Sequence, residues 1–186
     1  FGHKAAWYGP VEYTYTGITH KMQVMPEEFQ TIARQIEDAT GVPRGYYNSA
    51  LVNLFPAGKG IGAHADNEDI FIRANDTIGK VATVTLGGSS EIEISSISGK
   101  LRDKIPVSAG SMYVMPGQRF QLENLHKVGK ATKERISLTF RHIPNNRLPQ
   151  EAVDKFKVDP QVGKAIIGIL ETKSKNLAPE KVAAIV

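Results

Sequence analysis

The sequence contains no cysteine, and this absence removes several kinds of chemistry at once. Disulfide bonds, thiolate zinc sites, iron–sulfur clusters and a cysteine nucleophile are all excluded, so any metal ion must be held by histidine and carboxylate side chains. The chain also lacks an apolar run approaching the roughly 20 residues that span a bilayer, and its N-terminus has no signal-peptide pattern. We therefore expect no membrane segment in this chain. The lack of cysteine is compatible with a reducing compartment such as the cytoplasm.

The remaining composition is typical of an ordinary globular domain. With 186 residues, 41% of them hydrophobic and 23% charged, the chain is long enough for one domain with a sizeable core. The net charge of +4 favours an anionic partner such as a nucleic acid over a merely solvated basic surface. Because the chain begins at Phe1 rather than Met, we expect a domain that is part of a longer protein, a polyprotein. We also expect this domain to be monomeric.

A helix is predicted over residues Met25–Thr40. Pro26 and the two glutamates after it suit a first helical turn, and apolar residues then recur at the spacing of a helix face. Gly41 and Pro43 predict the end of this helix.

Between residues 46 and 142 the pattern changes to short strands separated by Gly, Pro and Asn. No helical crossovers lie between them, so a β-sandwich or jelly roll is favoured over a parallel sheet. The fold class is therefore mainly β with flanking helices (α+β). The predicted strands are Ala50–Phe55, Lys80–Leu86, Glu91–Ile97, Lys104–Val107, Ser111–Met115 and Glu134–His142.

The composition shifts again after the last strand, and residues 144–186 are predicted to be a helical appendage or a linker. Three short helices with Lys-rich surfaces are expected there, at Glu151–Lys157, Gln161–Lys173 and Pro179–Val186.

A candidate metal site begins in the segment Gly60–Asp66 (GIGAHAD), whose two glycines allow close approach of the backbone. If the chain is extended there, His64 and Asp66 lie on one face and offer an imidazole and a carboxylate to the same ion. His126 is the best candidate for a third ligand. Two histidines and one carboxylate leave about three positions open on an octahedral ion, as non-haem Fe(II) needs to bind a co-substrate and oxygen. Zinc on these ligands and a chance His-x-Asp pair on a turn are the alternatives.

The last predicted strand (ERISLTFRH) alternates strictly between an apolar face and a polar face with Arg135, Ser137, Thr139 and Arg141. Arginine binds carboxylates with two parallel hydrogen bonds, so this face could hold the dicarboxylate 2-oxoglutarate. Six steps of ~3.3 Å place the arginines roughly 20 Å apart, too far to bind one carboxylate together. We therefore expect Arg135 to bind the distal carboxylate, with Ser137 adding a hydrogen bond, and Arg141 to act on Asp66 or on the other end of 2-oxoglutarate. The alternative is a solvated face on an edge strand.

Taken together, these motifs resemble the AlkB family of Fe(II)/2-oxoglutarate-dependent nucleic-acid dealkylases. The pattern that carries the resemblance is His64-x-Asp66, then His126, then Arg135 and Arg141 in RISLTFR. It covers roughly Phe1–His142 and not the tail.

Residues around these motifs extend the resemblance. Asn53 and Phe55 lie where the family places an Asn and a Tyr that contact the co-substrate, and Glu68 follows His-x-Asp as an acidic residue does in several members. Phe55 departs from the family pattern because it lacks the hydroxyl, and Ser137 departs from it by replacing an Asn. The stretches most similar to AlkB domains in replicase polyproteins of plant RNA viruses are SMYVMPGQRFQ, at Ser111–Gln121, and Leu125–Val128.

The resemblance implies a dioxygenase domain over residues 1–143, with a lid region (1–24), the helix (25–40) and a double-stranded β-helix, or jelly-roll, core (46–142). It implies that Fe(II), 2-oxoglutarate and molecular oxygen are used to oxidise N-methyl groups of 1-methyladenine and 3-methylcytosine in single-stranded RNA or DNA. Formaldehyde, succinate and carbon dioxide are the expected products. The expected role is RNA repair, in the host cytoplasm if the polyprotein is viral.

The resemblance also suggests which residues bind the methylated base. Tyr15, with Tyr13 beside it, is the candidate for stacking on the cationic base, and Asn67 or Glu68 for reading its edge. Tyr13 and Tyr15 could equally form one face of an ordinary strand that packs into the core.

Lysines at positions 127, 130 and 133 follow the third ligand, and Lys127 is the one closest to it. In a loop they could track the phosphates of a bound strand, and a merely solvated loop is an equal alternative.

Two rival functions use the same motifs. An Fe(II)/2-oxoglutarate hydroxylase of proteins or small molecules shares the metal ligands but has no need of the tyrosine segment. A catalytically silent RNA-binding module would keep the scaffold alone. A zinc hydrolase is disfavoured by the two arginines.

Overall fold

Strand β11 (Arg135–Arg141) lies in the interior of the larger of two sheets, between β4 (Ser49–Phe55) and β6 (Val81–Gly87), so its charged residues are not on an edge strand. The computed structural model describes residues 3–15, 17–72, 78–117, 119–144, 147–148 and 182–184. The larger sheet has the order β1-β4-β11-β6-β9-β12, and its neighbours are antiparallel except for β12 and β9. Its strands are β1 (Lys4–Tyr8), β4 (Ser49–Phe55), β6 (Val81–Gly87), β9 (Met112–Met115), β11 (Arg135–Arg141) and β12 (Val182–Ala184).

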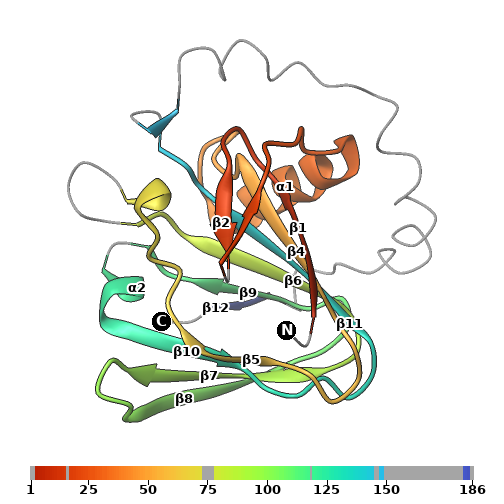
Figure 1. Ribbon diagram of the computed structural model, residues 1–186, viewed down its shortest axis with the longest axis vertical. Helices are drawn as coiled ribbons and strands as arrows, with labels where there is room; N and C mark the ends of the chain where they lie inside the picture. The colour runs from red at the N-terminus through yellow and green to blue at the C-terminus, as the bar shows by residue number, and fades with distance from the viewer. Residues whose placement is uncertain are drawn as a thin grey trace.

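The smaller sheet has four strands in the order β5-β10-β7-β8, and it faces the larger one (Figure 1). Apolar side chains of both sheets form one cluster, with Ile92 and Ile94 from the smaller sheet against Tyr113 and Met115 from the larger. Two facing antiparallel sheets confirm the predicted jelly roll. The strands of the smaller sheet are β5 (Ile61–His64), β7 (Ser90–Ser96), β8 (Leu101–Val107) and β10 (Asn124–Val128).

Helix α1 (Glu27–Thr40) covers the face of the larger sheet that points away from the smaller one (Figure 1). Its apolar stripe, which includes Phe29 and Ile32, packs against Leu138 and Phe140 of β11. The strict alternation predicted for β11 is therefore confirmed: one side of the strand meets the helix and the other faces the second sheet. Gly41 ends the helix as predicted, in the left-handed conformation with φ 66°.

The remaining elements are short and lie close to the ends of the strands. The N-terminal region forms the hairpin of β2 (Tyr13–Tyr15) and β3 (Ile18–His20), and two single-turn helices, η1 (Asp69–Phe71) and α2 (Phe120–Glu123), follow β5 and β9. Among the described residues, no helix is long and apolar enough to cross a membrane.

Two sequence-based predictions were wrong at the level of elements. Lys127 lies in strand β10 rather than in a loop. Residues Val182–Ala184 form β12, where a helix over Pro179–Val186 was expected. Short apolar runs are ambiguous between helix and strand, and here pairing with a sheet edge decides the outcome. The other two predicted tail helices lie outside the described residues.

Candidate metal centre

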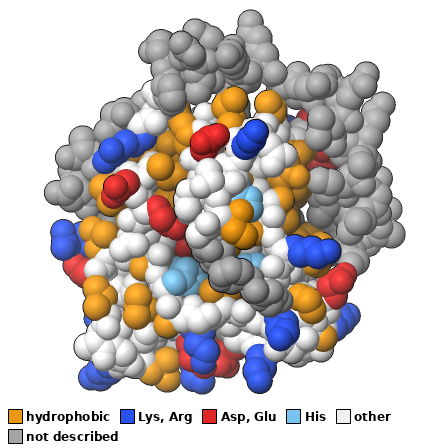
Figure 2. Space-filling model, viewed as in Figure 1, with side chains coloured by type: hydrophobic (Ala, Val, Ile, Leu, Met, Phe, Trp, Pro, Cys, Tyr) orange, Lys and Arg blue, Asp and Glu red, His pale blue; other side chains and the backbone are white. Residues whose placement is uncertain are grey.

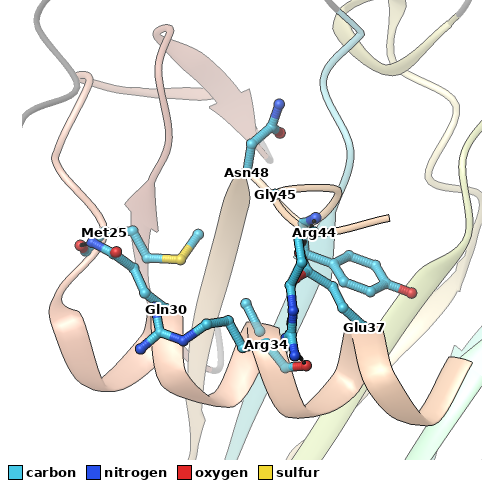
Figure 3. A pocket seen from close by; sticks show the side chains of 9 residues that line it. Met25, Gln30, Arg34, Glu37, Arg44, Gly45 and Asn48 are labelled. Carbon is cyan, nitrogen blue, oxygen red and sulfur yellow. Dashed lines mark hydrogen bonds and ion pairs between the residues drawn. The ribbon is translucent and has the colours of Figure 1, made fainter. Parts of the chain in front are cut away.

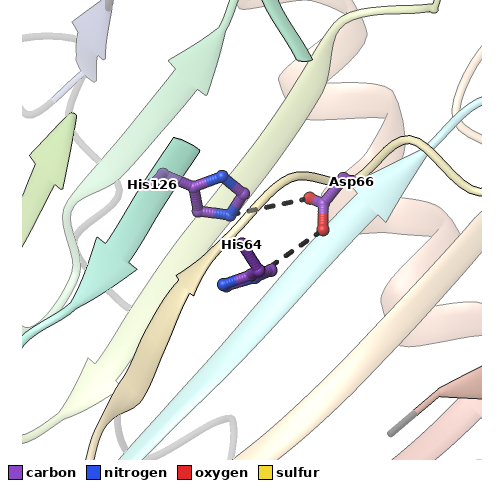
Figure 4. A group of neighbouring side chains, drawn as sticks. All are labelled: His64, Asp66 and His126. Carbon is purple, nitrogen blue, oxygen red and sulfur yellow. Dashed lines mark ion pairs between the residues drawn. The ribbon is translucent and has the colours of Figure 1, made fainter. Parts of the chain in front are cut away.

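Three predicted ligands meet between the two sheets (Figure 4). His64 ends β5, Asp66 follows it by two residues, and His126 lies on β10 directly opposite His64 in the strand register. One ligand atom from each residue lies within 4.8 Å of the others. The two Asp66 carboxylate oxygens are each 3.9 Å from an imidazole Nε2, Oδ1 from that of His64 and Oδ2 from that of His126. Three converging ligand atoms of this kind fit a divalent ion with open coordination positions.

The backbone around the triad explains why the ligands face one another. A Cβ at Gly60 would lie 2.3 Å from the carbonyl oxygen of Val128, so only glycine lets β5 approach β10 this closely. Gly62 was also predicted to allow a close approach of the backbone, and this was wrong, because no atom lies within 4 Å of a Cβ placed there. The carbonyl of Gly62 instead lies 2.8 Å from His64 Nδ1. With a proton on Nδ1, this bond leaves Nε2 free for a metal.

The protonation states also suit metal binding. Burial alone would raise the pKa of Asp66, but the Arg141 guanidinium and the two imidazoles bring it down to about 2. Burial lowers the pKa of His126 to about 4, and His64 and Arg141 act in the same direction. At neutral pH the site therefore offers a carboxylate and, at His126, a neutral imidazole, which are the forms that bind cations.

Asp66 is held in place by two residues from other elements. Arg141 Nη2 donates to Asp66 Oδ1 at 2.6 Å, as the sequence predicted for this arginine. The backbone N–H of Asp66 donates to Oε1 of Gln121 at 3.1 Å, and Gln121 Nε2 contacts Met115 Sδ at 3.3 Å. The role of Gln121 was not foreseen: it ends the stretch Ser111–Gln121 that carries part of the resemblance, but only the fold brings its side chain to Asp66.

Four of the five predicted co-substrate residues, Asn53, Arg135, Ser137 and Arg141, line the same cavity. Arg135 is 1% exposed; its Nη2 donates to Thr85 Oγ1 at 3.0 Å, while Nε and Nη1 have no hydrogen-bond partner among the described residues. A buried guanidinium with unused donors needs an anion, and a carboxylate fits its planar fork. Asn53 and Ser137 face each other across β4 and β11 and line the cavity, and the ring of Phe55 lies 5.4 Å from the guanidinium carbon of Arg135.

These contacts fit the cofactors that the sequence implies. The triad would hold Fe(II), while Arg135, Asn53 and Ser137 would hold the distal carboxylate of 2-oxoglutarate. The same cavity is also lined by three residues with hydroxyl groups, Thr83, Tyr113 and Thr139. Tyr113 and Thr83, like Gln121, were not singled out from the sequence.

The residues predicted to bind the base lie in different environments. Tyr15 is 7% exposed and belongs to the same buried cluster as Tyr13, as the core-packing alternative predicted, but it also lines the cavity beside the triad. Tyr13 is 2% exposed and packs against Trp7 and Phe71, with ring centroids 4.5 and 5.6 Å away. Tyr13 therefore has no open ring face for a base, and the alternative of a core-facing residue is correct for it.

Tyr13 instead connects two charged groups. Its hydroxyl accepts a hydrogen bond from Arg141 Nη1 at 3.1 Å and donates one to Glu68 Oε1 at 2.6 Å. Glu68 is half-buried, and its second oxygen, Oε2, has no hydrogen-bond partner in the described part of the chain. Asn67 is exposed.

Lys127 is exposed, and its Nζ lies 3.1 Å from Glu93 Oε2, so it forms an ion pair with this carboxylate. Lys130 and Lys133 lie in the connection between β10 and β11, as predicted.

A second pocket, of about 290 Å³, lies against α1 on the other face of the larger sheet (Figure 3). Its buried carboxylate, Glu37, is 2% exposed; it accepts a hydrogen bond from the Tyr47 N–H at 3.1 Å and lies 3.8 Å from Arg44 Nη1. Arg44 also donates to the carbonyl of Arg34 at 2.7 Å. These groups tie the segment after α1 to the helix, and none of the predicted site residues lines this pocket.

Comparison with known proteins agrees with the geometry. Residues 3–141 match the 2OG-Fe(II) oxygenase superfamily. Similar sequences include RNA replication polyproteins of Blueberry scorch virus, 30% identical over 90% of this chain, and Apple stem pitting virus (isolate PA66), 32% identical over 69%. The chain spans only 8% and 5% of those two proteins, so it corresponds to a small part of each of them.

A human relative and a solved structure extend the comparison. The human alpha-ketoglutarate-dependent dioxygenase alkB homolog 3 is 29% identical over 74% of this chain and 50% of that protein. The structure of OsALKBH1 has the same fold, with a TM-score of 0.59 at 17% identity over 76% of this chain and 79% of that one. The chain therefore belongs to the 2OG-Fe(II) oxygenase superfamily, whose dioxygenases use Fe(II), 2-oxoglutarate and oxygen, and an AlkB homologue is among its relatives.

Proposed function

We propose that this domain removes N-methyl groups from 1-methyladenine and 3-methylcytosine in single-stranded RNA or DNA, and that it acts in RNA repair. The observation that carries the choice of a base as substrate is Glu68. This carboxylate lies two residues after the metal ligand Asp66, and one of its oxygens is held by Tyr13 while the other has no partner among the described residues. A methylated adenine or cytosine is cationic and carries an exocyclic amino group, so it suits a carboxylate with a free oxygen.

Each part of the cavity has a defined task in this reaction. His64, Asp66 and His126 hold the metal, and Arg135 orients 2-oxoglutarate by its distal carboxylate. Fe(II), 2-oxoglutarate and oxygen, when bound, supply the oxidation: the N-methyl carbon is hydroxylated, and 2-oxoglutarate becomes succinate and carbon dioxide. The hydroxymethyl group then leaves as formaldehyde, and the base nitrogen recovers its electron pair.

We assign the substrate side to Tyr15, which lines the cavity, and to Glu68, which Tyr13 connects to Arg141. Tyr15 lines the cavity beside the ligands, where its ring can stack on a base that has left its strand. Glu68 would accept a hydrogen bond from the amino group of that base. Single strands are favoured because a base there leaves its stack at a lower cost than in a duplex.

The test is mass spectrometry of a short RNA with one 1-methyladenine, after incubation with the protein, Fe(II), 2-oxoglutarate and ascorbate. We expect the methylated product to lose one CH₂ in mass, with succinate released in equal amount. The same sequence as DNA, and with 3-methylcytosine, measures the preference among substrates.

His126→Ala is the control for catalysis, and we expect it to abolish turnover while leaving RNA affinity within about twofold.

Glu68→Gln keeps the size of the side chain and removes its charge, so it should lower turnover of methylated RNA more than uncoupled consumption of 2-oxoglutarate. Succinate release with peptides but not with methylated oligonucleotides would point to a protein hydroxylase. No succinate under any condition, with RNA binding intact, would point to a silent binding module.

A further inference from the structure

Strand β9 would be the last strand of the larger sheet without the C-terminal segment. Val182–Ala184 form β12 and pair with β9 in parallel, with Val182 opposite Met112, Ala183 opposite Tyr113 and Ala184 opposite Val114 (Figure 1). An unpaired edge strand presents a row of free N–H and C=O groups, and any extended segment can pair with it. The tail of this chain is the segment that occupies that edge.

The same strand forms part of the active-site wall. Tyr113 and Met115 of β9 line the cavity that contains the metal ligands and Arg135. On the other side of the strand, Met112 and Val114 belong to the core cluster under α1. Met115 Sδ also contacts Gln121, which accepts the hydrogen bond of the Asp66 N–H. If β9 becomes less well ordered, the positions of side chains in the co-substrate cavity and the support of the ligand Asp66 should therefore both change.

The pairing between β12 and β9 is short compared with the segment of chain that leads from β11 to β12. It joins three residues on each strand, whereas 40 residues lie between the end of β11 at Arg141 and the start of β12 at Val182. Closing a long segment costs conformational entropy, and only a few backbone hydrogen bonds offset that cost. The tail and the edge of β9 are thus suited to exchange between a paired and an unpaired state.

We propose that the outer edge of β9 is a strand-acceptor site occupied by the tail segment Val182–Ala184, and that its occupancy strengthens binding of 2-oxoglutarate. Pairing holds β9 straight, and this keeps Tyr113 and Met115 in position around the cavity. The inference concerns the co-substrate of the superfamily and does not depend on which methylated molecule is the substrate.

The test uses the full chain with Ala183→Pro and Ala184→Pro together. Consecutive residues of a strand point their N–H groups to opposite edges, so one of these two changes always removes an N–H that faces β9. Ala178→Pro makes the same chemical change in the tail outside β12 and serves as the matched control. Hydrogen exchange of the β9 amides measures the pairing directly. Titration of 2-oxoglutarate into the Mn(II)-loaded protein measures co-substrate affinity without turnover.

We expect exchange of β9 amides to rise at least tenfold in the double variant, with β4 and β11 unchanged, and 2-oxoglutarate affinity to fall by threefold or more. A synthetic peptide of residues 179–186, added in excess, should restore both values. Of the two single variants, one should reproduce the effect, because only one of the two N–H groups points at β9.

Unchanged exchange in β9 would show that the tail does not occupy the edge, and would overturn the proposal. Faster exchange with unchanged 2-oxoglutarate affinity would overturn the link to the cavity. A parent protein that binds 2-oxoglutarate but demethylates no oligonucleotide would contradict the proposed substrate, and both measurements on β9 would still be informative.

Discussion

Asp66 shows how much of this site depends on a single residue and its partners. It supplies the carboxylate of the triad, accepts a hydrogen bond from Arg141 and is held through its backbone by Gln121. Arg141 in turn is connected through Tyr13 to Glu68. A metal ligand whose orientation is fixed in this way needs little reorganisation when an ion binds. The sequence predicted Asp66 and Arg141, because both belong to motifs, but it could not predict partners that only the fold brings together.

Gln121→Met tests the backbone support of Asp66. The substitution keeps an unbranched side chain of similar length but leaves the buried N–H of Asp66 without an acceptor, which costs about 1–3 kcal/mol. We expect this loss in the free energy of unfolding measured with urea, together with weaker Mn(II) binding. Gln35→Met, on the exposed face of α1, is the matched control and should change neither quantity. Mn(II) affinity equal to that of the parent protein would contradict the positioning role.

Arg135→Gln tests the co-substrate pocket. The guanidinium is buried with two nitrogens lacking partners, so its removal should cost the bound carboxylate at least about 2 kcal/mol, or roughly thirtyfold in 2-oxoglutarate affinity. Mn(II) affinity should stay the same, because Arg135 donates its hydrogen bond to Thr85 and, among the described residues, none to the triad. Titrations of both ligands separate the two effects. Arg102→Gln, on exposed β8, is the control, and equal 2-oxoglutarate affinity in the two variants would contradict this assignment.

At the level of elements, predictions succeeded where one side-chain pattern decides the structure. Strand β11 alternates over its whole length because one face meets α1 and the other lines the cavity, so its period is visible in the sequence. Strand β10 was not predicted, because its sequence, NLHKV, mixes polar and charged residues with apolar ones. It pairs with β5 on one side and with β7 on the other, and this pairing depends on the fold. The same limit applies to β12, where the edge of β9 determines the conformation.

The end of α1 offers a test at this scale. Gly41 has φ 66°, and nothing lies within 4 Å of a Cβ added to it, so Gly41→Ala introduces backbone strain without a clash. We expect a loss of about 1 kcal/mol in the free energy of unfolding. Gly62→Ala adds the same methyl group at another open position, but without a positive φ, and should cost much less. Equal losses in the two variants, measured by urea unfolding, would show that the left-handed conformation is not the cause.

On the scale of the whole molecule, the metal site joins the two sheets of the jelly roll. His64 and His126 lie on strands of the smaller sheet, whereas Arg141, which holds Asp66, lies on the larger. His126 lies far from His64 and Asp66 in sequence, so the three ligand atoms come together only when β5 and β10 are paired, and Arg141 of the larger sheet then holds Asp66. An ion that binds all three ligands therefore binds the folded state and not the unfolded chain.

Metal binding should consequently stabilise the whole domain. With Mn(II) at about 100 times its dissociation constant, the expected gain is about 2.7 kcal/mol, which raises the unfolding midpoint by roughly 5–10 °C for a chain of this size. His126→Ala should abolish the rise, while His20→Ala, on strand β3 away from the triad, should retain it. Calorimetry with and without EDTA measures the difference. If Mn(II) raised the midpoint equally in His126→Ala and the parent protein, the ion would be binding elsewhere, and the triad would not be the metal centre.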